Sequence, residues 1–166
     1  AHFAGIKKGV DRQFDKPHRG KKRGKLSSIL RLAYYSTDYV GGYFIKVHPF
    51  LFKRSIIIFD RYYTDIICDS RRSSIYLSHK FLYWFGRLSI PSLRYNILLT
   101  ADSQTILERK QELDKESIDV INHKIDYLAT KKGYYKVMNE GTPQEAVEKI
   151  LQIIFEEQHK MNIKRL

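Results

Sequence analysis

The sequence predicts an α/β fold in which a parallel sheet is flanked by helices. Three short apolar runs rich in β-branched or aromatic residues, near 55–60, 94–100 and 134–139, are typical of strands. Stretches of helical periodicity separate them, and strands that alternate with helices indicate a parallel sheet with right-handed crossovers. At 166 residues, the chain is long enough for one domain with a substantial core.

Residues 1–25 are expected to form a basic arm or loop. They are rich in Gly and Lys and carry more than half of the chain's net charge of +12. Such an arm favours an anionic partner, such as a nucleotide, a nucleic acid or an acidic surface, although a solvated segment explains the charge equally well. The run 20–27 is not a Walker A loop, because three residues rather than four separate its glycines and Leu26 follows Lys25.

Residues 26 to about 47 predict an amphipathic helix. Ser27 or Ser28 can cap its N-terminus, and the pair Gly41-Gly42 is expected to bend or end it. Side chains at spacings of three and four mark one face: Leu30, Ala33, Tyr34, Thr37 and Val40. The tyrosines are expected in the core rather than as a platform for a ligand: Tyr34, Tyr35, Tyr39 and Tyr43.

The run 55–60 is the most informative stretch. Its isoleucines predict a buried central strand, which leads directly into Asp60 and Arg61. Ligands of open α/β sheets bind beyond the carboxyl ends of the strands, where these two residues stand. Arginine offers a planar fork of donors that suits a phosphate. The alternative is that Asp60 caps the next helix and Arg61 is a surface residue.

The elements after this run alternate between helix and strand. A cluster of acids and bases follows Tyr63 and fits a substrate site and a solvated helix face equally well: Asp65, Asp69, Arg71 and Arg72. A mostly buried helix is expected over 75–88, and Asp102 or Ser103 should cap another. Further helices are predicted over 114–130 and from the cap Thr142-Pro143 to about 156, which leaves 157–166 as a charged tail.

Asp60-Arg61-Tyr62 after a β-branched strand resembles the Asp-Arg-Tyr/His element of thymidylate kinase and related P-loop nucleoside-monophosphate kinases. The order of elements is similar over residues 26–156, but the family's first strand and P-loop are not in this sequence. Either they precede Ala1 in a longer chain, or the chain is a degenerate relative. The resemblance implies a P-loop kinase-like fold and a phosphotransferase that uses ATP and Mg²⁺ with a nucleoside monophosphate or another phosphorylated acceptor.

The resemblance also implies roles for individual residues. Asp60 would lie near the Mg²⁺ ion and the acceptor, Arg61 would clamp a phosphate, and Arg109 would be a lid arginine that approaches the transferring phosphate. Arg109 is equally well explained as a surface charge paired with Glu108 or Glu112. The resemblance implies that Asp102 ends the next strand. It further implies a substrate-binding set of Tyr39, Tyr62, Asp65, Asp69, Arg71 and Arg72, and a cofactor-binding set of Arg109, Lys110, Asn139 and Gly141.

The acceptor is not predicted to be thymidine phosphate, because the residues after Tyr62 depart from the thymine-binding pattern. The tyrosine-rich segment together with Asp60-Arg61-Tyr62 looks more like the thymidylate kinase-like proteins of bacterial surface-polysaccharide gene clusters. The competing hypotheses are a basic nucleic-acid-binding module, favoured by the net charge and the 12 tyrosines, and a purely structural domain.

Other residue types make further functions improbable on the sequence. The six histidines show no close pair at metal-ligand spacing, and the single cysteine, Cys68, is expected to be a small buried residue. No apolar run approaches the roughly 20 residues of a membrane span. A reducing cytoplasm is the simplest compartment for a chain with one cysteine, and a second copy of the chain is a further candidate partner.

Overall fold

A computed structural model describes residues 24–53, 55–109 and 112–164. The chain divides into two compact units, the first ending at Ser92 and the second beginning at Leu93. The described residues are mostly helical, with one two-stranded parallel sheet, so the predicted mixture of helices and parallel strands is confirmed at that level. Most of the predicted basic arm, residues 1–23, lies outside the described residues.

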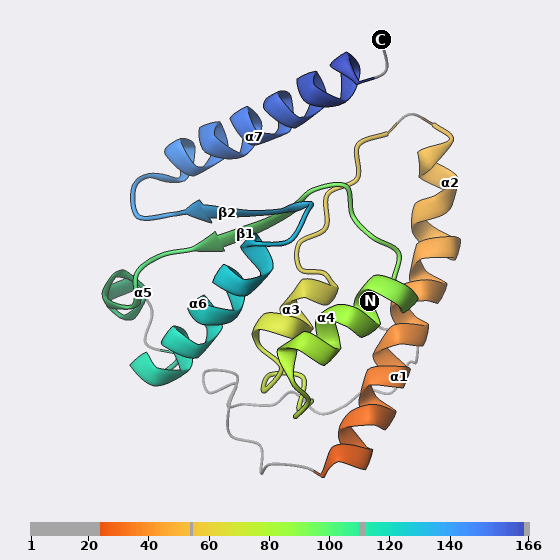
Figure 1. Ribbon diagram of the computed structural model, residues 1–166, viewed down its shortest axis with the longest axis vertical. Helices are drawn as coiled ribbons and strands as arrows, with labels where there is room; N and C mark the ends of the chain where they lie inside the picture. The colour runs from red at the N-terminus through yellow and green to blue at the C-terminus, as the bar shows by residue number, and fades with distance from the viewer. Residues whose placement is uncertain (1–23, 54, 110–111, 165–166) are drawn as a thin grey trace. The chain divides into compact units, whose positions relative to one another are not determined.

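A long helical rod is the first described element of the first unit (Figure 1). Helix α1 (Lys25–Gly42) continues through a single π-helical segment, η1 (Tyr43–Val47), into the short helix α2 (His48–Leu51). The predicted helix is confirmed, but the glycine pair does not end it, since Gly42 keeps helical dihedrals of −60° and −38°. A glycine lowers helix stability by only about 1 kcal/mol, and the flanking turns outweigh that cost.

The predicted strand at 55–60 is wrong as a strand. Residues 55–59 form no regular secondary structure, and within the described residues the sheet contains only two later segments. Ile56 and Ile58 are 92% and 88% exposed, whereas a central strand would bury them. A strand exists only when a neighbour pairs with its backbone groups, and the composition of the run carries no information about that neighbour.

Two short helices hold the core of the first unit. Helix α3 (Tyr63–Cys68) packs against helix α4 (His79–Ser89), which starts later than the predicted 75 because Ser78 caps it by accepting a hydrogen bond from the Phe81 N–H at 3.2 Å. The buried apolar side chains of this unit are Leu32, Tyr62, Tyr63, Ile66, Ile67, Cys68, Ile75, Leu82 and Ile90. The prediction that Cys68 is buried is therefore confirmed.

The second unit is built on two parallel strands. Strand β1 (Asn96–Thr100) pairs with strand β2 (Tyr134–Met138) over five residue pairs, which confirms both predicted strands. Helix α6 (Lys115–Ala129) and helix α7 (Pro143–Ile163) lie on opposite sides of the pair (Figure 1). The crossover between the strands also contains the short helix α5 (Ser103–Arg109).

Local capping signals fix where these helices begin. Asp114 accepts a hydrogen bond from the Ser117 N–H at 2.7 Å at the start of α6. Thr142 and Glu145 form a reciprocal capping box at the start of α7, as the Thr142-Pro143 pair predicts. Helix α7 continues to Ile163, beyond the predicted end near 156, so 157–163 is helical rather than a tail. The buried apolar residues of this unit are Leu98, Ala101, Ile118, Ile125, Leu128, Val137 and Ala146.

None of the helices in the described ranges combines the length and the apolar character that a membrane-crossing segment requires.

Candidate functional site

Arg61 has an unusual backbone conformation at the end of the extended run. Its φ is +69°, in the left-handed region, and Ser74 is the only other non-glycine residue described with a positive φ. A non-glycine residue in a sparsely populated region costs roughly 1–3 kcal/mol and persists only where neighbouring contacts hold it. The sequence predicts a site at Asp60 and Arg61. The strained backbone of Arg61 is a second unusual feature at this place, and the residue types do not indicate it.

The two residues that follow Arg61 are tyrosines that are held in place by hydrogen bonds. The Tyr62 hydroxyl donates a hydrogen bond to the Pro91 carbonyl at 2.7 Å, and the Tyr63 hydroxyl donates one to the Leu82 carbonyl at 2.9 Å. Both side chains are buried. The Tyr63 ring lies directly on Gly86, where a Cβ atom would be 2.1 Å from ring atom Cε1. These contacts fix the chain just after Arg61 and can therefore sustain its strained backbone.

Within the part of the chain that the structure describes, the Arg61 guanidinium is only partly engaged by protein groups. Its Nη1 lies 3.4 Å from Oδ2 of Asp65, one helical turn later, and the two side chains are 54% and 45% exposed. An exposed ion pair of this kind contributes at most about 1 kcal/mol. An incoming phosphate, which forms stronger bidentate contacts with arginine, can replace such a partner at small cost.

Asp65 occupies a less polar environment than an ordinary surface carboxylate. Burial raises the pKa of its carboxyl group above the ordinary value; the positive charges of Arg61 and Arg72 oppose the rise, and Asp69 adds to it. Arg61, the predicted phosphate clamp, and the predicted substrate-binding residues Asp65, Asp69 and Arg72 are therefore electrostatic neighbours. Helix α3 and the turn that follows it bring them together.

Tyr39 joins this group from helix α1. Its ring centroid lies 5.1 Å from that of Tyr62 and 6.0 Å from that of Tyr63, both in edge-to-face geometry. Burial, followed by the charges of Asp65 and Asp38, raises the pKa of Tyr39 to about 12. The phenol is therefore neutral at physiological pH and keeps its proton as a donor. Asp38, which the sequence analysis does not assign to the site, lies close enough to act on it.

Asp69, Arg71 and Arg72 lie in the turn after α3. The Asp69 carboxylate accepts a hydrogen bond from the Arg72 backbone N–H at 3.3 Å, so part of its role is local. Arg71 and Arg72 are exposed, as is Asp60. The structure is therefore compatible both with a solvated acid-and-base cluster and with a site in which Arg72 acts on Asp65 together with Arg61.

Asp102 is a helix cap. Its carboxylate accepts hydrogen bonds from the backbone N–H groups of Gln104 at 2.8 Å and Thr105 at 3.1 Å, and from the Thr105 hydroxyl. The hydrogen bond from the Thr105 hydroxyl is the largest cause that lowers the pKa of Asp102. The capping role that the sequence predicts for Asp102 or Ser103 is confirmed for Asp102.

Arg109 reaches across the second unit to a loop after β2. Its Nη1 donates to the Asn139 carbonyl at 2.5 Å, and its Nη2 donates to the Glu140 carbonyl at 2.8 Å and the Gly141 carbonyl at 3.4 Å. Three members of the predicted cofactor-binding set, Arg109, Asn139 and Gly141, are thus brought together. The fourth, Lys110, lies outside the described residues.

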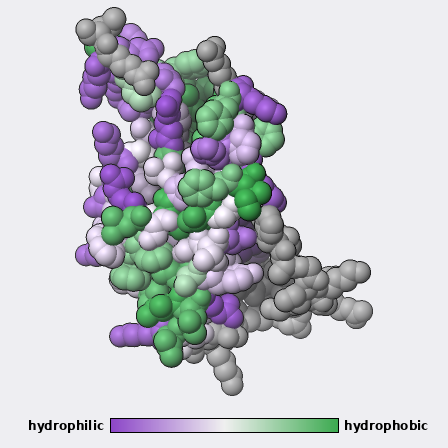
Figure 2. All heavy atoms as spheres, turned by 90° about the vertical axis from the view of Figure 1, so that its right-hand side faces the viewer, coloured by the Kyte–Doolittle hydropathy of each residue, from purple (hydrophilic) through white to green (hydrophobic). Residues whose placement is uncertain are grey.

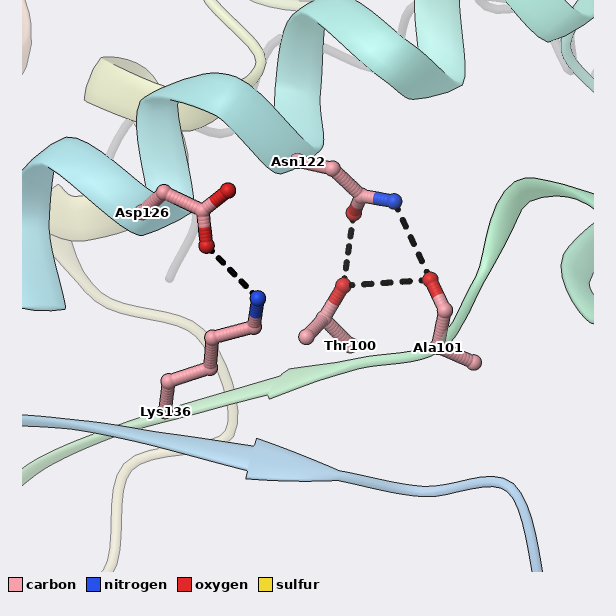
Figure 3. A network of polar contacts seen from close by, with 5 residues as sticks. All are labelled: Thr100, Ala101, Asn122, Asp126 and Lys136. Atoms are coloured by element: carbon pink, nitrogen blue, oxygen red, sulfur yellow. Dashed lines mark hydrogen bonds and ion pairs between the residues drawn. The ribbon is translucent and has the colours of Figure 1, made fainter.

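A polar network that the sequence analysis missed lies at the carboxyl end of β1 (Figure 3). The Thr100 hydroxyl donates to Oδ1 of Asn122 at 2.6 Å, and the Asn122 amide donates to the Ala101 carbonyl at 3.0 Å. Beside it, Lys136 pairs with Asp126 at 2.6 Å. The only signal in the sequence is that Asn122 interrupts the apolar pattern of α6.

The candidate site offers few side chains that could bind a divalent metal ion. Within the ranges that the structure describes, no three or more His, Cys, Asp or Glu side chains are grouped to hold a metal ion. In phosphoryl-transfer sites, Mg²⁺ is usually bound through one or two carboxylates together with the substrate phosphates. Asp60 therefore fits an ion that arrives with a nucleotide, but not a metal site built by the protein.

Comparison with known proteins does not identify a family. No protein-family model matches the chain, and neither a curated protein nor a solved structure matches it. A function for this chain therefore rests on its own residues and their geometry.

Proposed function

We propose that the chain is a nucleotide kinase-like phosphotransferase, a fragment or degenerate member of that class, which acts between ATP and a nucleoside monophosphate or related phosphorylated acceptor. The observation that carries the proposal is Arg61. It combines a left-handed backbone, anchored by Tyr62 and Tyr63, with a half-exposed guanidinium whose ion-pair partner among the described residues is weak. Strained non-glycine residues of this kind cluster at active sites and ligand clamps, which favours a binding role for Arg61.

In this proposal, the first unit binds the acceptor. Arg61 holds the acceptor phosphate through two parallel hydrogen bonds, and Asp65 moves from Arg61 to a polar group of the acceptor. The neutral phenol of Tyr39 offers a further donor beside Asp65. Asp60 orients the nucleotide-borne Mg²⁺, whose charge would stabilise the transferring phosphoryl group.

Three of the predicted cofactor-binding residues, Arg109, Asn139 and Gly141, belong to the second unit. Arg109 fixes the backbone of residues 139–141 through their carbonyl oxygens, which keeps that loop ordered. Its guanidinium is committed to those carbonyls, so a role at the transferring phosphate requires that these hydrogen bonds break. The acceptor function of Arg61 does not depend on that step.

Calorimetric titration with a panel of nucleoside monophosphates and with inorganic phosphate tests the acceptor site. The best-binding monophosphate should lose at least about tenfold in affinity in Arg61→Gln, since a bidentate charged contact is removed. The matched control is Arg87→Gln, which removes an exposed arginine from α4 and should leave the affinity unchanged. Equal affinity of Arg61→Gln and the parent chain would reject the acceptor site.

Turnover is tested on the product of the complete reading frame, because the present sequence contains no Walker A motif. Mg²⁺-dependent phosphoryl transfer that is lost in Asp60→Asn, with monophosphate binding retained, is the expected result. If the product neither transfers phosphate nor binds monophosphates, and instead binds oligonucleotides with an affinity that falls steeply with salt, the nucleic-acid-binding module would be favoured.

A further inference from the structure

The helical rod 25–51 turns an apolar face to solvent. The face is formed by large side chains that are each about half exposed or more, here called the outer face: Leu26, Ile29, Leu30, Tyr34, Phe44 and Ile45. Figure 2 views the molecule from the side of this rod and shows hydrophobic side chains gathered along it. An amphipathic helix normally packs its apolar face against the core, so the predicted face has the opposite placement.

The buried side of α1 is separate from the outer face. Ser28, Leu32 and Ser36 are the buried residues of the helix. The Ser36 hydroxyl donates to the Leu32 carbonyl at 2.6 Å, and the Ser28 hydroxyl accepts a hydrogen bond from the Tyr76 N–H at 3.0 Å. The serines are thus satisfied against the first unit. The rod is attached through this side, which leaves the outer face in contact with water.

The outer face is long and continuous. Ala33 and Thr37 are also exposed and follow Leu30 at spacings of three and four residues, so uncharged side chains extend along α1. The 27 residues of the rod give it a length of about 40 Å at 1.5 Å each. Helices with one apolar and one charged side lie in the plane of a membrane surface and bury the apolar side by about 5–10 Å. The shape of the outer face fits such a surface.

Positive charges accompany the outer face. The segment 25–53 carries four cations against one acid, a net charge of +3: Lys25, Arg31, Lys46 and Lys53 against Asp38. Residues three or four apart are neighbours on a helix surface, which places Lys25 beside Ile29 and Arg31 beside Tyr34. At the other end of the rod, the Lys53 ammonium lies 5.5 Å from the centroid of the half-exposed Phe50 ring. Cations therefore stand next to exposed apolar side chains at both ends.

We propose that the outer face docks on the surface of an anionic lipid bilayer, with the rod parallel to the membrane plane. The apolar side chains then enter the boundary between headgroups and acyl chains, and the flanking cations meet anionic headgroups. The residues that precede the rod, 1–24, contain eight Lys or Arg and two Asp, and their net charge of +6 adds to the attraction.

Charge separates this partner from two others. A second copy of the chain would bring the same net positive charge against the rod, whereas anionic headgroups complement it. A nucleic acid would satisfy the cations but would leave the apolar side chains of the outer face in water. Of these three partners, an anionic bilayer alone satisfies both parts of the surface.

Co-sedimentation with vesicles tests the apolar part of the surface. The parent chain should bind vesicles of equal parts phosphatidylcholine and phosphatidylserine. Leu30→Glu should weaken this binding at least about tenfold, because it places a carboxylate at the apolar contact. Leu88→Glu is the matched control, since Leu88 on α4 is 68% exposed and Leu30 is 64% exposed. A parent chain that does not bind, or equal weakening by both variants, would overturn the proposal.

The charged part is tested with the same vesicles. Phosphatidylcholine alone should bind the parent chain much more weakly, and added salt should weaken binding to the mixed vesicles. Lys25→Gln combined with Lys46→Gln should lower the affinity about tenfold or more. The control is Lys115→Gln combined with Lys149→Gln, which removes the same charge from α6 and α7. Equal binding to both kinds of vesicle would reject an anionic surface.

A fluorescent label tests whether the outer face itself enters the bilayer. A label on Thr37→Cys should become shielded from iodide, a quencher that stays in water, when mixed vesicles are added, whereas a label on Glu148→Cys should not. The single native cysteine, Cys68, is buried, so the label reports on the introduced position. Equal quenching of the Thr37→Cys label with and without vesicles would overturn the docking. A chain that ignores vesicles but forms a dimer that Leu30→Glu disrupts in sedimentation equilibrium would identify a second copy as the occupant instead.

Discussion

At the scale of single residues, the candidate site depends on backbone conformations that the residue types do not predict. Asp60 and Arg61 stand out in the sequence because a charged pair follows an apolar run. The left-handed φ of Arg61 has no such signal, and the tyrosines that follow it bind carbonyl groups 29 and 19 residues later in the chain. The contact of Arg109 with the loop 139–141 is equally remote in sequence.

Gly86 is predicted to be indispensable beside Tyr63. Gly86→Ala should lower the free energy of unfolding by about 1–3 kcal/mol, because its Cβ would overlap the Tyr63 ring at 2.1 Å. Gly42→Ala is the matched control: it is also helical, its Cβ would meet nothing within 4 Å, and it should raise stability by up to about 1 kcal/mol. Urea unfolding measures both, and effects of the same sign would contradict the packing argument.

The raised pKa of Asp65 predicts a specific pH dependence. A carboxyl group whose pKa is higher in the folded than in the unfolded chain binds more protons when folded. Its contribution to the free energy of unfolding therefore falls as pH rises from the ordinary pKa of 3.8 through the raised value. Asp65→Asn removes this titration, so the variant should gain stability relative to the parent chain as pH rises through that interval.

Urea unfolding at a series of pH values checks the Asp65 prediction. Glu148→Gln, which removes an exposed carboxylate from α7, is the control and should show a much smaller change in relative stability with pH. A stability difference between Asp65→Asn and the parent chain that is constant with pH would show that burial does not perturb this carboxyl group.

At the scale of elements, local sequence signals predict helix caps and short strands, but they do not predict which strand pairs with which neighbour. The cap at Thr142-Pro143 and the strands β1 and β2 are confirmed because short-range chemistry and composition specify them. The run 55–59 fails as a strand because its pairing depends on a neighbour that its own residues do not encode. Periodicity likewise located a face on α1, but it could not tell which surface covers that face.

The network between the end of β1 and helix α6 is predicted to contribute to the stability of the second unit. Asn122→Ala should lower the free energy of unfolding by about 1–3 kcal/mol, since it leaves the partly buried Thr100 hydroxyl and Ala101 carbonyl without the amide. The exposed Lys136–Asp126 pair is the contrast, and Lys136→Met should cost at most about 1 kcal/mol.

A double-mutant cycle isolates the Thr100–Asn122 hydrogen bond. Thr100→Val combined with Asn122→Leu should cost less than the sum of the two single changes, because the double variant leaves no unpaired group from this bond. Strict additivity in chemical denaturation would mean that the two side chains do not depend on each other.

At the scale of the whole molecule, the sequence predicts the class of fold but not its division. The mixture of helices and parallel strands follows from the order of patterns along the chain. The two compact units were not expected, since no shift in composition marks the boundary at Ser92 and Leu93. The residues proposed to bind the acceptor, from Tyr39 to Arg72, belong to the first unit, and Arg109, Asn139 and Gly141 belong to the second.

The exposed isoleucines of residues 55–59 have a consequence for the protein in concentrated solution. The run is uncharged, β-branched and free of proline, the composition of segments that stack between molecules into aggregates. Lys53 and Asp60 flank it as charged gatekeepers. Ile56→Lys and Ile58→Lys should therefore raise solubility in turbidity measurements while changing the free energy of unfolding by no more than about 0.5 kcal/mol. Unchanged turbidity would show that these two side chains do not drive aggregation.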